Sequence, residues 1–253
     1  MAPTPPRYEV IGIVGLGEVR PGDDVTRLLV DAARAQGTPL ATHDVLVVGQ
    51  KIVSKAEGRI LKLSEVEPAP ATRRMAESLG RDPKLLEVIL RESRRVVRMD
   101  KGVVITETHH GWICANAGVD QSNVDADTVA LLPEDPDRSA RALRDGILAL
   151  TGAEVAVLIA DTFGRPWREG LTNVAIGLAG LPALIDYVGK PDSAGRPLQM
   201  TMLAVADELA SAAEIVQGKL DRIPAAIVRG LRLEAADGGS KVLLRDPSRD
   251  LFR

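Results

Sequence analysis

The hydrophobic pattern of the chain mixes short continuous apolar runs with longer stretches in which apolar residues recur one helical turn apart. Four runs predict strands: YEVIGIV at 8–14, DVLVV at 44–48, VAVLIA at 155–160 and PAAIV at 224–228. The run at 155–160 is typical of a strand buried on both faces, and it is expected to end at Asp161. Residues 96–118 predict paired strands.

Helices are predicted between these strands. An acidic N-cap introduces a helix over 25–37, and amphipathic patterns predict further helices at 133–152 and 205–220. Residues 68–95 predict helices with a strongly charged surface, and a polar loop carrying Lys51, Ser54 and Lys55 is expected after the strand at 44–48. Strands and helices are therefore mixed without strict alternation.

Charge and composition narrow the range of functions that the protein can have. The 253 residues include 32 Lys and Arg against 35 Asp and Glu, and the net charge of −3 gives no general attraction to nucleic acid or an anionic membrane. Aromatic residues are only 2% of the chain, which argues against stacking on bases. The single cysteine excludes an internal disulfide and a cysteine cluster for zinc, and fits the cytoplasm. No signal peptide or membrane-spanning run is recognisable, so one soluble unit over 1–253 is expected.

Two carboxylates are the strongest candidates for chemistry. Asp120 lies in GWICANAGVDQSNVD at 111–125, and Asp161 follows VAVLIA. With the Thr162 hydroxyl and the Asn123 carboxamide they form a set of hard oxygen ligands, which Mg²⁺ or Mn²⁺ prefers. The alternative is that Asp120 caps a turn and Asp161 caps a helix, and spacing alone does not separate the two interpretations.

Other polar positions have a structural as well as a functional interpretation. Arg165 and Arg168 suit an anion or a solvated loop, while His109 and His110 are expected on a strand, each in a structural role. Cys114 is expected to be a buried thiol. Four arginines are predicted to share one helix face as an anion patch or a solvated surface: Arg91, Arg94, Arg95 and Arg98.

Glycines after the first strand do not make a nucleotide fingerprint. GIVGLGEV lacks the third glycine of a dinucleotide-binding motif, and no GxxxxGK[ST] sequence occurs in the chain. A tight turn after a strand is the simpler interpretation.

Six motifs in order resemble those of the coenzyme F-420:L-glutamate ligase family: GLGE, QKIVSKAEGR, CANAGVDQSNV, ADTFGRPWREG, VADELASAAEIVQGK and the terminal SRDLFR. The resemblance implies an α+β fold with mixed sheets and helices in two intertwined subdomains, a homodimer, and no appended C-terminal reductase-like domain. It also implies GTP-dependent ligation of L-glutamate, through its α-amine, to the phospholactyl carboxylate of the deazaflavin coenzyme precursor, with further γ-linked glutamates possible.

The resemblance also assigns roles to residues. Asp120 and Asp161 would hold Mg²⁺ or Mn²⁺, and Thr162 would assist at a second cation, for which K⁺ is a candidate. Asp120, Asp161 and Lys55 would form the catalytic set. GTP would contact three groups of residues: Gly15, Leu16, Gly17 and Glu18; Gln50, Lys55 and Asn123; and a segment from Gln217, Gly218 and Lys219 to about Pro224. Gly17 replaces the family's usual proline, and Gln50 replaces a frequent serine.

The expected mechanism is activation of a carboxylate as an acyl phosphate, which needs positioning and charge neutralisation rather than a protein nucleophile. A metal-dependent phosphohydrolase and a non-enzymatic nucleotide-binding domain are the alternatives.

Overall fold

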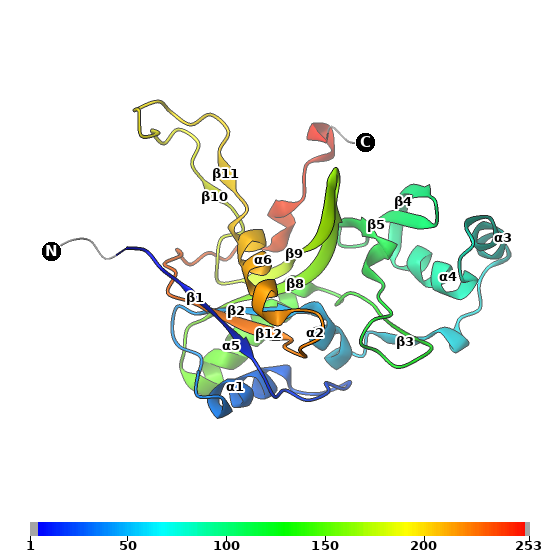
Figure 1. Cartoon of the computed structure of the whole chain (residues 1–253), viewed down its shortest axis with the longest axis horizontal. Helices are drawn as coiled ribbons and strands as arrows, with labels where there is room; N and C mark the ends of the chain where they lie inside the picture. Colours follow the sequence, from blue (N-terminus) through cyan, green and yellow to red (C-terminus); the bar gives the residue numbers. More distant parts are fainter. Residues whose placement is uncertain (1–4, 251–253) are drawn as a thin grey trace.

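A computed structural model describes residues 5–250. Its centre is a five-stranded sheet in the order β1-β12-β2-β8-β9 (Figure 1). The strands are β1 Glu9–Ile13, β12 Ala225–Arg229, β2 Val45–Gly49, β8 Ala156–Arg165 and β9 Arg168–Ala179. β2 and β8 run parallel, and the other neighbours are antiparallel. The four apolar runs thus form strands, as predicted.

Helices cover both faces of this sheet. Leu46, Val48, Val157 and Ile159 belong to a core shared with α1 (Val25–Ala35) and α5 (Pro136–Thr151). Val45, Val47, Leu158 and Ala160 belong to a second core shared with α6 (Val205–Gln217). Because successive side chains of a strand point to opposite faces, continuous apolar runs supply both cores.

A second group of elements is built around a third core (Figure 1). It contains α3 (Pro70–Leu79), α4 (Pro83–Arg91), a sheet of β4 (Ser93–Asp100), β5 (Val103–Thr108) and β6 (Ile113–Ala115), and a pair formed by β3 (Ile60–Lys62) and β7 (Thr128–Ala130). The short 3₁₀ turns η1 (Leu63–Glu65) and η2 (Asn116–Gly118) connect them. Helices with mixed sheets confirm the α+β class, while the division into two intertwined subdomains stays a prediction.

The remaining elements lie near the C-terminal part of the chain. β10 (Ile185–Asp186) pairs with β11 (Met202–Leu203) at the base of an arm that projects from the body (Figure 1). Two 3₁₀ turns follow β12, η3 (Ser240–Leu243) and η4 (Pro247–Arg249). Within residues 5–250, no helix is both long and apolar enough to cross a membrane.

Three local predictions are wrong. The segment after β2 is the helix α2 (Gln50–Ala56) rather than a loop, because Ile52 and Val53 pack into the first core. β8 continues past Asp161 to Arg165, because β9 pairs with it along the whole polar stretch. Only Arg91 of the four arginines is helical. The other three lie on β4, where Arg94 and Arg95 pair with Glu107 and Arg98 pairs with Asp100.

Candidate functional site

The predicted site segments meet at one end of the central sheet. The register pairs Ile13 with Ala225, Ala225 with Val48, and Gly49 with Ala160. The Gly15–Glu18 turn after β1, helix α2 after β2, Asp161 on β8 and the 217–224 segment before β12 therefore lie at the same end. Strand topology alone brings these distant parts of the chain together.

Asp120 is held by short contacts in this region. It forms a bridge with Ala130, and its Oδ2 lies 2.8 Å from Lys51 Nζ on α2. Its Oδ1 accepts a 2.7 Å hydrogen bond from the Ser122 backbone N–H, so Asp120 does cap a turn. Burial raises the pKa of Asp120, but the hydrogen bonds from Lys51 and Ser122 outweigh it and leave the pKa below its ordinary value. The carboxylate is thus held ionised beside a lysine.

Asp161 has the opposite titration behaviour. Burial raises its pKa to about 6 against a hydrogen bond from the Thr162 backbone, and the negative charge of Asp120 raises it further. Lys51 and Lys219 lower it in part. Asp161 lies opposite Val174 within a strand, so the helix-cap interpretation is wrong. The two carboxylates are close enough to repel each other, which is the setting that a divalent cation would relieve.

Thr162 belongs to a different network. Its hydroxyl donates a 2.7 Å hydrogen bond to Asn173 Oδ1 and accepts one of 2.7 Å from Lys219 Nζ. Glu214 completes the network, with 2.6 Å to Lys219 and 2.8 Å to Asn173 Nδ2. Successive strand residues face opposite sides, so Thr162 faces the α6 side and Asp161 the α1 and α5 side. The assignment of Thr162 to a second cation stays a prediction.

Asn173 and Glu214 were not predicted as site residues. The available signal for Glu214 was its position one helical turn before Gln217 in EIVQGK. Asn173 gave none, because its role depends on the pairing of β9 with β8.

Lys55 and Glu18 form an ion pair across the same end of the sheet. Only 13% of the Lys55 side chain is exposed, against 71% for Glu18, so the lysine is the anchored partner. Gly15 and Gly17 have φ of 79° and 72°, and Leu16 is buried in the first core. Proline is fixed near −65°, so a proline could not adopt the φ that Gly17 has in this turn.

Two buried glutamines have unsatisfied polar atoms. Gln50 and Gln217 are 2% and 4% exposed, and Ser54 donates a 2.7 Å hydrogen bond to Gln50 Oε1. Gln50 Nε2 and Gln217 Oε1 have no hydrogen-bond partner within the described part of the chain. Gly218 has a φ of 56°, which turns the chain directly after α6. Asn123 lies exposed in the segment that follows Asp120 and has a φ of 56°.

No cluster of three or more His, Cys, Asp or Glu side chains suited to a metal occurs in residues 5–250. A metal at this site would therefore have two protein carboxylates and would take its other ligands from phosphate oxygens or water, as Mg²⁺ commonly does.

The remaining candidates differ in their burial. Cys114 is buried, and burial together with the Asp161 charge raises its pKa to about 12, which confirms a packed thiol. His109 and His110 lie in the turn after β5 rather than on a strand, where their Nε2 atoms bond backbone carbonyl oxygens. Arg165 and Arg168 are exposed at the β8–β9 turn, and four residues of strand place Arg165 roughly 13 Å from Asp161.

These features define an α+β protein with a paired-carboxylate site among lysines at the end of its central sheet. A family model described as F420-0:Gamma-glutamyl ligase matches residues 14–230. The chain is similar to the Coenzyme F420:L-glutamate ligase of Methanopyrus kandleri, with 48% identity covering 93% of this chain and 94% of that protein. It is also similar to the protein of the same name from Methanothermobacter thermautotrophicus, with 46% identity covering 96% of this chain and 98% of that protein. The chain belongs to the F420-0:gamma-glutamyl ligase family.

Proposed function

We propose that this protein ligates L-glutamate, through its α-amine, to the phospholactyl carboxylate of the deazaflavin F420 precursor, with GTP as the energy source. Family membership supports the ligation of glutamate to F420. The observation that carries the nucleotide-dependent chemistry is that Asp120, paired with Lys51, lies near enough to the buried Asp161 carboxylate to raise its pKa. Repelling carboxylates among lysines suit a cation and the phosphates that accompany it.

The residues present fit a divalent metal. Asp120 and Asp161 supply hard anionic oxygens, and Asp120 is already ionised through its contacts with Lys51 and Ser122. These two side chains would hold Mg²⁺ or Mn²⁺, and Thr162 would serve a second cation such as K⁺. When bound, the divalent cation supplies neutralisation of phosphate charge.

The nucleotide also has unmet partners in the protein. A buried polar atom without a hydrogen bond costs on the order of 1–3 kcal/mol, and Gln50 Nε2 and Gln217 Oε1 are two such atoms near the end of the sheet. Lys55 pairs with an exposed glutamate, which a phosphate oxygen can replace. We infer that GTP lies across the Gly15–Glu18 turn, α2 and the 217–224 segment.

The reaction then proceeds in two steps. The γ-phosphoryl group of GTP passes to the precursor carboxylate, forming an acyl phosphate and GDP. The neutral α-amine of glutamate attacks the acyl carbon, an amide bond forms, the nitrogen releases one proton to solvent, and inorganic phosphate leaves with the electron pair of the broken C–O bond. Lys51 and Lys55 would orient and balance the anionic groups, and no protein nucleophile is needed.

Measuring GTP turnover with and without co-substrates tests this function. A ligase needs both the precursor and L-glutamate for substantial turnover, and mass spectrometry should detect a product heavier by one or more glutamyl units. Free turnover of GTP alone would instead favour a metal-dependent phosphohydrolase. Binding of GTP without turnover under any condition would favour a nucleotide-binding domain.

The resemblance to the family also supports two proposals about the protein's state. We infer that it is a homodimer, which sedimentation equilibrium can test. We infer a cytoplasmic location, because GTP and L-glutamate are available there. Fractionation of cells that produce the protein tests the location.

A further inference from the structure

The β3–β7 pair has one face toward the third core and one toward the carboxylates. Leu61, Val129 and Leu131 pack with the third core. Ile60 pairs with Ala130, and Ala130 also forms the bridge with Asp120. Side chains of directly opposed residues lie on the same face of a sheet, so Ile60 and Asp120 share the other face. Lys62, two residues after Ile60, shares it too.

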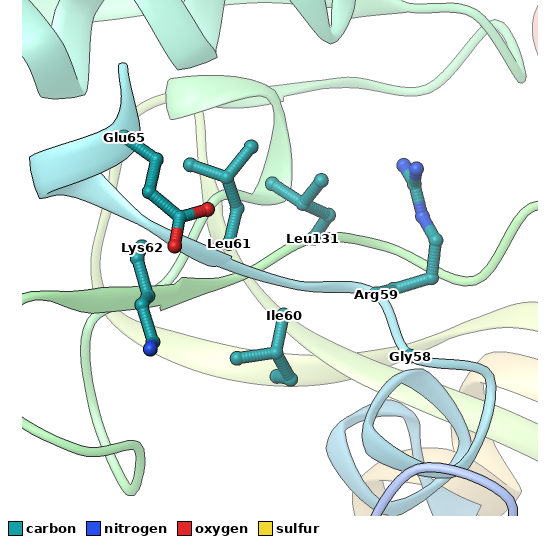
Figure 2. Close-up of a pocket in the computed structure, with 7 residues that line it drawn as sticks. All are labelled: Gly58, Arg59, Ile60, Leu61, Lys62, Glu65 and Leu131. Atoms are coloured by element: carbon teal, nitrogen blue, oxygen red, sulfur yellow. The ribbon is translucent and has the colours of Figure 1, made fainter.

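A cavity of about 420 Å³ lies along β3. It is lined by residues 58–62 together with Glu65 and Leu131. Figure 2 shows Ile60 and Lys62 pointing to one side of the strand, with Leu61, Leu131 and the Arg59 guanidinium on the other side. The cavity begins at Gly58, two residues after the end of α2, the helix that carries Lys51 and Lys55.

Of the two cations that line the cavity, only Lys62 is available. Arg59 donates to Glu92 Oε2 at 2.6 Å and to the Leu132 carbonyl oxygen at 3.0 Å. Lys62 is exposed, and its ammonium group has no hydrogen bond or ion pair within residues 5–250. Hydrogen bonds from Ser64 are the main cause that lowers the pKa of Asp127, and the charges of Lys84 and Lys62 lower it further. Lys62 and Asp127 do not form an ion pair.

We propose that this cavity is the subsite for a carboxylate of the glutamyl substrate and that Lys62 binds it. The inference rests on the proposed ligase function. Two strand spacings and a two-residue rise separate the Asp120 and Lys62 backbones by roughly 12 Å. A glutamyl group whose nitrogen reacts near the carboxylate pair extends its carboxylates in this direction, and the long lysine side chain covers the remaining distance.

The local charges favour a carboxylate over a phosphate. Glu65 lines the cavity and Asp127 lies near both Lys84 and Lys62, so two carboxylates oppose two ammonium groups, of which only that of Lys62 belongs to a cavity residue. A doubly charged phosphate would meet stronger repulsion than a singly charged carboxylate. Lysines for phosphate are already present at the sheet end, where Lys51 and Lys55 lie.

Steady-state kinetics of Lys62→Met with precursor, GTP and varied L-glutamate tests the subsite. Loss of a charged hydrogen bond should raise the KM for L-glutamate about tenfold or more, while the KM for GTP changes less than about twofold. Lys62→Arg should restore much of the affinity. Lys190→Met, on the projecting arm, is the matched control and should behave as wild type. Both Lys62 variants should keep the wild-type Tm because Lys62 has no partner to lose.

Each result decides the proposal. A raised glutamate KM in the first addition identifies free glutamate as the ligand, and a defect confined to later additions, seen by mass spectrometry, identifies the γ-glutamyl tail. Unchanged kinetics in both additions, or an equal rise in the KM for GTP, would overturn the subsite. A wild-type protein that makes no ligated product would instead overturn the proposed function.

Discussion

Asp161 combines a rigid backbone with an unfavourable charge. Pairing with Val174 of β9 fixes its backbone, one residue after the β2 pairing ends at Ala160, while burial and Asp120 disfavour its ionised form. A structural protein would gain by replacing such a group, so its presence suits a ligand that compensates the charge. Lys51 and Lys219 offset this charge only in part.

Asp161→Asn is expected to fold normally, because the amide has nearly the same size and strand pairing uses only the backbone. Losing the charge that offsets a divalent cation should lower the ligation rate about a hundredfold, or about 3 kcal/mol. High Mg²⁺ or Mn²⁺ should restore part of the rate. Asp145→Asn, on the exposed surface of α5, is the control. A wild-type rate with unaltered metal dependence would remove Asp161 from the metal site.

Lys55→Ala is expected to raise the KM for GTP at least about tenfold, since a charged hydrogen bond to phosphate is lost. The substitution also breaks the ion pair with Glu18. Glu18→Gln separates the two effects, because it removes the ion pair but keeps the lysine charge. Equal defects in both variants would show that Lys55 acts by holding the turn rather than by binding GTP.

Cys114 should resist thiol reagents in the folded protein. With a pKa of about 12, only on the order of one thiol in ten thousand is ionised near pH 8, and the side chain is buried as well. Alkylation followed by mass spectrometry should find modification only after denaturation, and Cys114→Ala should retain ligase activity with some loss of stability. Rapid labelling of the native protein would contradict this assignment.

At the level of elements, the sequence predicts strands and long helices better than the short polar segments between them. β2, α5 and α6 follow from local hydrophobic periodicity, which needs no knowledge of partners. Helix α2 was mistaken for a loop because its seven residues offer too little periodicity, and only packing of Ile52 and Val53 reveals it. The predicted end of β8 at Asp161 is too early, because the polar half of the strand is stabilised by its pairing with β9, which local sequence does not reveal.

The residue types of the candidate site can be read from the sequence, but their placement relative to one another cannot. Asp120 and Asp161 stood out by residue type, but their proximity depends on the bridge to Ala130 and on the order of strands. Lys62 was not recognised, since an isolated lysine on a short strand gives no signal until the sheet face is known.

The contact between α6 and β9 contains a carboxylate, Asp207, that should make the stability of the protein depend on pH. Asp207 accepts a 2.9 Å hydrogen bond from the Ala175 backbone N–H, yet burial raises its pKa. A raised pKa means that the folded state holds the proton more tightly than the unfolded state. This contribution to stability is therefore present below the unfolded pKa and is lost as pH rises through the folded pKa.

Asp207→Asn keeps an acceptor for Ala175 and cannot ionise. The free energy of unfolding of the variant, relative to wild type, should therefore increase between about pH 4 and about pH 7. Urea denaturation at both pH values measures it. Glu208→Gln, an exposed neighbour in the same first turn, controls for loss of a negative charge at the helix N-terminus. An advantage that falls with rising pH would show that the helix dipole outweighs burial at Asp207.

At the scale of the whole molecule, the candidate site lies between the first and third hydrophobic cores. Helix α2 belongs to the first core, whereas Val119, next to Asp120, belongs to the third. A ligand that contacts Lys55 and Asp120 together would therefore connect the two cores, and its binding energy would add to their association. Binding to the folded state alone stabilises a protein by about 2.7 kcal/mol at a ligand concentration one hundred times Kd.

Mg²⁺ and GTP together should therefore raise the Tm by more than the sum of their separate effects, because each supplies charge that favours the other. Differential scanning calorimetry with each ligand alone and with both measures this coupling. Hydrogen exchange should slow in α2 and around residues 119–123 together, since one ligand contacts both. In Asp161→Asn the extra shift from Mg²⁺ should largely disappear while binding of GTP alone remains. The same Mg²⁺-dependent shift in that variant, or protection of α2 without residues 119–123, would place the nucleotide away from the carboxylate pair.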